Sequence, residues 1–158
     1  MTIYEIENFL FKVGASKYRT KEFEKNYPGF SAISRFGIGI LTCFLIANDI
    51  DIITNSEDEE SAIMISIRKV DGKYLLKKFE KDVLDDFIQR HGTKITLHVR
   101  PDNELKDIEM ELRKWILFPS CEVILMIDDS DAIKIGYGSP AEALESIIKK
   151  RGVHKIKC

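Results

Sequence analysis

Two glycines stand where the backbone could bind an anion. They lie in the stretch Ser34-Arg35-Phe36-Gly37-Ile38-Gly39, which runs directly into the apolar segment 40–47. A tight glycine turn that opens a helix aims backbone N–H groups and the positive helix end at one place, a common way to bind phosphate. The same pattern is typical of an ordinary turn before a helix, so the glycines alone leave both interpretations open.

Short motifs for other chemistries are absent from the sequence or incomplete. The chain has no G-x-x-x-x-G-K-[ST] loop and no G-x-S-x-G nucleophile turn. Asp128-Asp129-Ser130-Asp131 lacks the turn glycine and the later acids of a calcium loop. Gly136-Tyr137-Gly138 fits a loose dinucleotide pattern, but no strand follows it to complete the unit. The three histidines and three cysteines do not have the spacing of a zinc site.

The composition is typical of a globular domain and excludes two classes of partner. The chain has 158 residues, 44% hydrophobic and 32% charged, which suits one domain with a sizeable core. A net charge of -2 predicts no nucleic-acid partner, and no apolar run is long enough to predict a membrane span. Widely spaced cysteines and an N-terminus unlike a secretory signal favour a reduced, cytoplasmic setting.

Periodicity predicts the elements around the glycine turn. Helical spacing predicts helices over 2–13, 36–47, 103–116 and 139–151, separated early by a polar, basic loop over 14–30. Capping boxes at Thr2-Ile3-Tyr4-Glu5 and Ser139-Pro140-Ala141-Glu142 and a cap at Asn103 mark three of the helix starts. Runs rich in β-branched residues predict strands over 51–54, 62–70, 73–79, 94–99 and 121–127, with a hairpin at Asp71-Gly72. We therefore expect an α+β domain with a mostly antiparallel sheet.

The order of these motifs resembles the GHKL ATPase superfamily, and within it the ninety-kilodalton heat-shock chaperones and their bacterial relatives. Arg35-Phe36-Gly37-Ile38-Gly39 with its apolar helix is similar to that family's glycine-rich loop, and Gly92-Thr93 is similar to its Gly-Thr box. The resemblance covers about residues 1–128 and implies a partial Bergerat fold, a two-layer sandwich with helices covering one face of an antiparallel sheet. Residues 129–158 would be a C-terminal strand and helix extension of the same domain.

The resemblance implies nucleotide contacts for eight residues: Arg35, Phe36, Gly37, Ile38 and Gly39 through backbone amides at the phosphates, Thr93 at the adenine edge directly or through water, and Ser16 and Lys17 at the end of a lid segment. The alternative interpretations are core packing for Phe36, an ordinary strand start for Thr93, and a solvated basic loop for Ser16 and Lys17.

Two motifs of the family have no match in this chain. One is a helix that supplies a general-base glutamate and a magnesium-binding asparagine. The other is a D-x-G-x-G-M turn, of which Met1-Thr2 resembles only the tail. Ser34 also stands where the family commonly has a glycine. We therefore expect the C-terminal part of a larger domain, with no catalytic or metal-binding residue and with neither ATP nor Mg²⁺ retained by this chain.

The resemblance implies that the intact parent binds Mg-ATP and couples hydrolysis to lid closure and dimer contact. For this chain alone we expect no hydrolysis and weak or no ATP binding. An incomplete domain would expose apolar surface, which favours a homodimer or other self-association. The alternative is a non-catalytic protein-interaction module that keeps the fold without the nucleotide chemistry.

Overall fold

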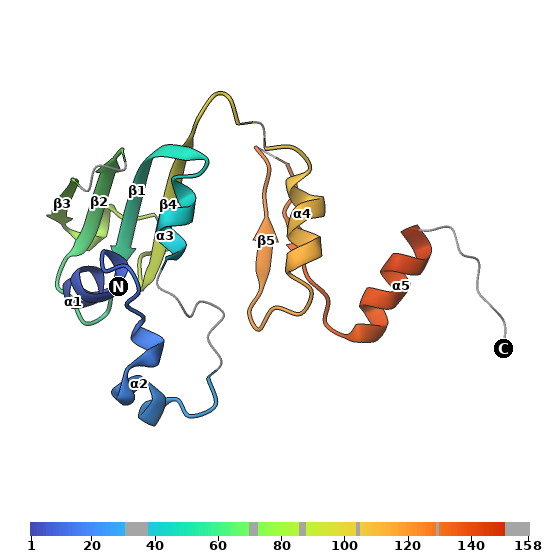
Figure 1. Cartoon of the computed structure of the whole chain (residues 1–158), viewed down its shortest axis with the longest axis horizontal. Coiled ribbons are helices and arrows are strands. Elements are labelled where there is room, and N and C mark those ends of the chain that lie inside the picture. The colour runs from blue at the N-terminus through green and yellow to red at the C-terminus, as the bar shows by residue number, and fades with distance from the viewer. Residues whose placement is uncertain (31–37, 70–72, 86–87, 104, 129, 151–158) are drawn as a thin grey trace. The chain divides into compact units, whose positions relative to one another are not determined.

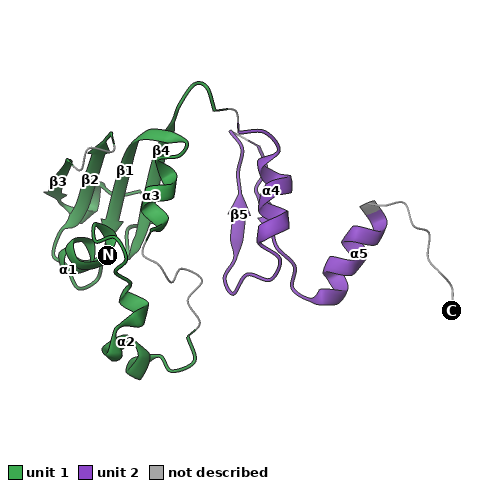
Figure 2. Ribbon diagram, viewed as in Figure 1, with its two compact units in different colours: residues 1–103 green, residues 104–158 purple. Residues whose placement is uncertain are grey.

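The computed structural model of the chain describes residues 1–30, 38–69, 73–85, 88–103, 105–128 and 130–150 (Figure 1). The chain divides into two compact units, Met1–Asn103 and Glu104–Cys158, which are described separately (Figure 2). The assignment of residues 1–128 to one nucleotide-binding domain, with 129–158 as its extension, stays a prediction.

The first unit combines an antiparallel sheet with short helices (Figure 1). Among the described residues the sheet has four strands in the order β3-β2-β1-β4: β1 (Ala47–Asn55), β2 (Ala62–Arg68), β3 (Tyr74–Phe79) and β4 (Gly92–Val99). The helical segments are α1 (Ile3–Glu5), its π-helical continuation η1 (Ile6–Leu10), η2 (Lys17–Arg19), α2 (Lys21–Asn26), α3 (Gly39–Cys43) and η3 (Lys81–Val83). The predicted α+β class with an antiparallel sheet is confirmed.

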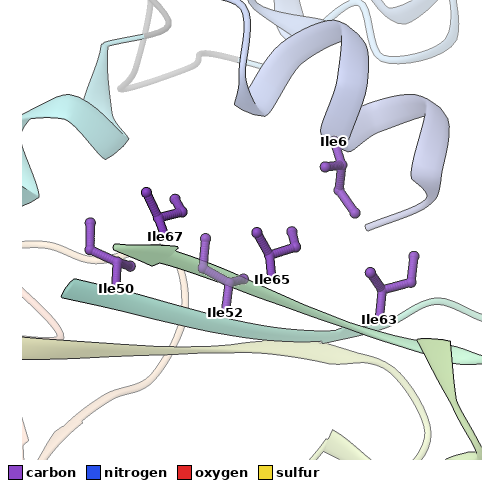
Figure 3. Close-up of a cluster of buried hydrophobic side chains, with 6 residues drawn as sticks. All are labelled: Ile6, Ile50, Ile52, Ile63, Ile65 and Ile67. Carbon is purple, nitrogen blue, oxygen red and sulfur yellow. The ribbon is translucent and has the colours of Figure 1, made fainter. Parts of the chain in front are cut away.

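The core forms because β1 and β2 place β-branched residues on one face at every second position. Their register pairs Ile50 with Ile67 and Ile52 with Ile65, so these isoleucines stack side by side. Ile6 of η1 packs onto this row from above the sheet (Figure 3). Burying each such side chain contributes roughly 1.5–3 kcal/mol. Residues in or next to α1, η1 and α3 also pack against this cluster: Ile3, Leu10, Phe11, Ile40, Cys43 and Phe44. Helices therefore cover one face of the sheet, as expected.

The prediction of a helix over 36–47 is wrong about the C-terminal end of the helix. Residues 31–37 lie outside the described residues, and α3 ends at Cys43. Ala47 already belongs to β1, which is nine residues long rather than the predicted 51–54. The chain leaves the helix because the backbone N–H of Arg100 donates to the Ile46 carbonyl at 2.9 Å and Ala47 pairs with Val99 in the β-ladder.

Two further local predictions are corrected by the structure. The segment 14–30 is not irregular throughout, because Thr20 caps α2 by accepting a hydrogen bond from Phe23 N at 3.2 Å. Asn103 does not cap the following helix, since its side chain donates to Ile46 O at 3.4 Å and the helix begins later, after Asp107. By contrast, the capping box of Thr2 and Glu5 at the start of α1 is confirmed.

The second unit is small and built around a two-stranded antiparallel sheet. Its elements are α4 (Ile108–Trp115), β5 (Val123–Leu125), β6 (Ile133–Ile135) and α5 (Pro140–Lys150). Arg113 of α4 donates to the Lys134 carbonyl at 3.3 Å, which joins α4 to β6. The buried strand predicted over 121–127 is shorter than expected, and Ile124 at its centre is 54% exposed. A two-stranded ladder of three residue pairs offers little area for burial, which explains this exposure.

Candidate functional site

The two strands at the centre and edge of the sheet bring two threonine hydroxyls together. Thr54 ends β1, Thr93 begins β4, and the ladder pairs them directly. Their Oγ1 atoms lie 2.9 Å apart, and Thr54 Oγ1 also lies 3.2 Å from the Gly92 carbonyl oxygen. Thr54 is fully buried whereas Thr93 is exposed. Because strand alternation puts both on the helix-covered face, Thr93 presents its hydroxyl on that face of the sheet.

Asn55, the next residue of β1, holds the turn that leads into β4. Its Nδ2 donates to the carbonyls of Ile88, Gln89 and Arg90 at 3.1, 2.8 and 3.2 Å. Gly92 is required here, since its φ is 155° and a Cβ would lie 3.0 Å from Ile88 Cγ2. The Gly-Thr sequence is therefore fixed by packing against the turn as well as by the β-ladder.

A pocket beside Met1 gathers two more of the predicted residues. It has a volume of about 270 Å³ and is lined by Met1, Glu5, Phe9, Leu10, Ala15, Ser16, Lys17 and Tyr18. The Met1 amino group donates to Thr54 Oγ1 at 2.6 Å, which links this pocket to the threonine pair. Met1 thus lines the pocket that includes Ser16 and Lys17 and also contacts Thr54 of the threonine pair.

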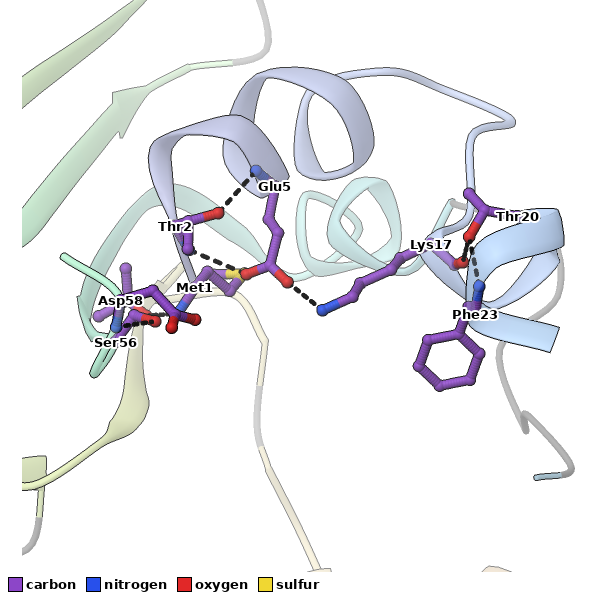
Figure 4. Close-up of polar contacts among 9 residues, drawn as sticks. Met1, Thr2, Glu5, Lys17, Thr20, Phe23, Ser56 and Asp58 are labelled. Carbon is purple, nitrogen blue, oxygen red and sulfur yellow. Dashed lines mark hydrogen bonds and ion pairs between the residues drawn. The ribbon is translucent and has the colours of Figure 1, made fainter. Parts of the chain in front are cut away.

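Glu5 organises the polar side of this pocket (Figure 4). One carboxylate oxygen accepts from Thr2 N at 2.8 Å, and the other is ion-paired with Lys17. Burial raises the pKa of the Glu5 carboxyl, but the hydrogen bonds from Lys17 and Thr2 outweigh that effect, so its pKa lies below the usual value. The same contact with Glu5 raises the pKa of Lys17. Burial lowers the pKa of the Met1 amino group.

The glycine loop is only partly described. Arg35, Phe36 and Gly37 lie outside the described residues, so their predicted phosphate contacts remain predictions. Ile38 and Gly39 are exposed at the start of α3 and do not line the Met1 pocket. The next residues, Ile40 and Leu41, line a separate apolar pocket of about 320 Å³. Ser16 and Lys17 therefore line the Met1 pocket, Thr93 is connected to Met1 through the Thr54 hydroxyl, and Ile38 and Gly39 are part of neither contact.

Within the described residues, no group of three or more histidine, cysteine, aspartate or glutamate side chains could hold a metal ion. None of the described helices combines the length and apolar character needed to cross a bilayer.

Sequence comparison identifies relatives that match most of this chain. HtpG chaperone proteins are 28% identical over 118 residues in Oceanobacillus iheyensis and 29% identical over 105 residues in Clostridium acetobutylicum. These alignments cover 74% and 66% of the chain, but 18% and 16% of the relatives. The chain is homologous to part of the HtpG chaperones. Its resemblance to a partial GHKL-type, heat-shock chaperone-like ATPase domain is therefore confirmed.

Other comparisons define the extent of this homology. The HtpG chaperone of Orientia tsutsugamushi is 31% identical over 81 residues, which are 50% of this chain and 12% of that relative. No protein-family model matches the chain. The chain thus spans less than a fifth of the length of these HtpG relatives.

Sequence reasoning missed the residues that support Thr93. Asparagine is typical of turns, and Asn55 directly follows the predicted strand 51–54. In the structure it is 1% exposed, and its side chain donates to the carbonyl of Gln89 in the turn before β4. Thr54 carried no signal beyond its β-branched side chain. Both contacts join positions more than 30 residues apart, so local patterns could not reveal them.

Proposed function

We propose that this chain carries one side of an adenine-nucleotide pocket from a chaperone-like ATPase domain. Thr93 contacts the adenine edge, Ser16 and Lys17 approach the phosphates, and backbone amides of 35–39 complete the phosphate contacts. The observation that carries the proposal is the linkage of Thr93, Thr54 and Met1 beside a pocket lined by Ser16 and Lys17. Homology to the HtpG chaperones supports the same function.

Lys17 is suited to a phosphate contact although it is paired with Glu5. Its side chain is 48% exposed, so solvent and a ligand can reach the ammonium group. A triphosphate carries more negative charge than a single carboxylate and would compete for the same ammonium donors. Binding would then release Glu5 from Lys17 while Thr2 N keeps its hydrogen bond to the Glu5 carboxylate.

Titration of the ¹⁵N-labelled chain with Mg-ATP, followed by NMR, tests this proposal. We expect millimolar binding with shift changes at Thr93, Ser16 and Lys17, weakened about tenfold by Thr93→Val or Lys17→Ala. Thr96→Val and Lys25→Ala are matched controls on the same strand and in the same segment, and should bind like the unmodified chain. Absence of any shift change at saturating nucleotide would favour the alternative, a non-catalytic interaction module.

We further propose that the chain alone hydrolyses no ATP. The general-base glutamate and the magnesium-binding asparagine expected of the family have no match in its sequence. A nucleophilic water would therefore lack a base to activate it. Magnesium-dependent phosphate release by the purified chain, above that of a Thr93→Val variant, would contradict this proposal.

Self-association and a cytoplasmic setting complete the proposal. Trp115 is 85% exposed, and several other apolar side chains of the second unit are more than half exposed: Leu105, Phe118, Ile124, Met126 and Leu144. Covering such side chains favours association of two copies. Light scattering with concentrations from micromolar upward should detect dimers, and a monomer across the whole range would contradict association.

A cytoplasmic setting is consistent with the cysteine usage.

A further inference from the structure

The helix α5 has two different sides. Ala143 is 8% exposed, and the Tyr137 hydroxyl donates to Ser146 Oγ at 3.2 Å, so this side of α5 is turned toward its own unit. Three larger apolar side chains of the same helix are exposed to solvent at 58%, 46% and 37%: Leu144, Ile147 and Ile148. We call these three residues the α5 stripe.

The spacing of the α5 stripe makes it one continuous apolar surface. Positions three and four apart are neighbours on a helix, so Leu144 lies beside both isoleucines. With eleven residues, α5 is shorter than the roughly 12–15 residues that an isolated helix needs in water. Covering the stripe would therefore stabilise the helix itself. Because α5 lies outside residues 1–128, the proposed nucleotide contacts do not use this surface.

The charges of α5 change sign along the helix. Glu142 and Glu145 stand in its first half, and Lys149 stands near its end. When two such helices lie antiparallel, Glu145 of each copy comes beside Lys149 of the other, and the two helix dipoles oppose each other favourably. A parallel pair would instead place like charges side by side. The helix is therefore complementary to a second copy of itself in the antiparallel direction.

We infer that α5 is a self-association helix, whose stripe packs antiparallel against the α5 stripe of a second copy of this chain. This inference rests on the proposed self-association and assigns it to one element and one orientation. In the symmetric pair Leu144 faces Ile148 of the other copy, and Ile147 lies near the two-fold axis. Both copies thus bury the same three side chains, and Glu145 meets Lys149 twice at the border of the interface.

Sedimentation of the whole chain at micromolar to millimolar concentrations measures the dissociation constant of the dimer and tests this inference. Ile147→Lys brings two ammonium groups together near the axis and should raise the dissociation constant at least about tenfold. Trp115→Lys is a matched change at an exposed apolar position of α4 and should raise it less than about threefold. Both positions are exposed, so neither change should unfold the unit.

A pair of charge reversals tests the orientation. Glu145→Lys alone should weaken the dimer about fivefold, because it sets a second cation beside Lys149 of the other copy. Adding Lys149→Glu to the same chain should restore most of the affinity of an antiparallel pair. In a parallel pair each position would face its own copy, so the second reversal would restore nothing.

The possible outcomes separate this inference from the proposed self-association. An unchanged dissociation constant in Ile147→Lys would overturn the inference while leaving self-association intact, as would no loss in Glu145→Lys or no recovery in the double variant. Dissociation by Trp115→Lys with little effect of Ile147→Lys would assign the contact to α4 and overturn it too. A monomeric unmodified chain over the whole concentration range would overturn the proposed self-association itself.

Discussion

Asp51 on β1 and His98 on β4 meet across the strand pair, with 2.7 Å between Oδ2 and Nε2. The other carboxylate oxygen of Asp51 accepts from Ser66 at 2.6 Å and from Arg68 at 2.7 Å on β2. These groups lie on the face of the sheet opposite the isoleucine core. One carboxylate therefore connects three neighbouring strands, and a one-residue slip of any strand would break its contacts.

The Asp51 contacts make the free energy of unfolding depend on pH in the acidic range. Burial raises the pKa of this carboxyl, but hydrogen bonds from Ser66, His98 and Arg68 outweigh it and lower the pKa to about 2. A group with a depressed folded-state pKa stabilises the fold above its unfolded value and loses that effect as the pH falls. We expect Asp51 to contribute about 2 kcal/mol to the stability that urea denaturation shows lost between pH 5 and pH 2, so the loss in Asp51→Asn should be smaller by that amount.

Asp82→Asn, at an exposed position in η3, is the control and should retain the wild-type acid dependence. Equal pH profiles for Asp51→Asn and the unmodified chain would show that the Asp51 network does not stabilise the folded state.

Asn55 is predicted to be the most sensitive polar residue of the sheet. Asn55→Ala removes the donor to three carbonyls at the turn before β4, leaving them without that partner. We expect a loss of about 2–3 kcal/mol in the free energy of unfolding, and faster hydrogen exchange at Thr93. Asn48→Ala at an exposed position of the same strand should change stability by less than about 0.5 kcal/mol. Similar losses for both variants would contradict the clamp.

Gly136 is predicted to be required by packing in the second unit rather than by a ligand. Its φ is 93°, and a Cβ would lie 2.4 Å from Pro119 Cδ. Gly136→Ala should therefore cost about 2–4 kcal/mol, measured as faster hydrogen exchange across β5 and β6. At Gly138 the nearest atom to a new Cβ is the flexible Glu142 carboxylate at 3.3 Å, so Gly138→Ala should have little effect. Comparable exchange in both variants would argue against this explanation.

Phe23 is predicted to hold the segment 14–30 together. Its ring lies 5.2, 4.7 and 5.3 Å from those of Tyr18, Tyr27 and Phe30. Phe23→Ala should accelerate hydrogen exchange in α2 about tenfold while β1 and β2 stay protected, because the aromatic cluster is separate from the isoleucine core. Phe23→Leu keeps apolar bulk and should give a smaller change. Equal acceleration in the sheet would mean that the cluster also stabilises the core.

Local sequence patterns were sufficient for much of the fold. The capping box of Thr2 and Glu5 and the β-branched runs of β1 and β2 rest on neighbours within a few residues. The sequence therefore predicts these elements, although β1 extends beyond the predicted 51–54. The end of α3 was predicted wrongly because hydrogen bonds from β4, about 50 residues away, draw the chain around residues 46 and 47 into the sheet. Helix propensity depends on neighbouring residues alone and does not include hydrogen bonds from such distant positions.

The sequence by itself determined the α+β class, the antiparallel pairing of β2 with β3 and the resemblance to a chaperone-like ATPase domain. Only the tertiary structure decided that Thr54 would partner Thr93, and that Asn55 would clamp the turn beside it. Helices and hairpins follow from contacts between near neighbours, whereas the register of β1 against β4 is set by burial of a whole isoleucine face. That register aligns two hydroxyls 39 positions apart, and no local pattern specifies it.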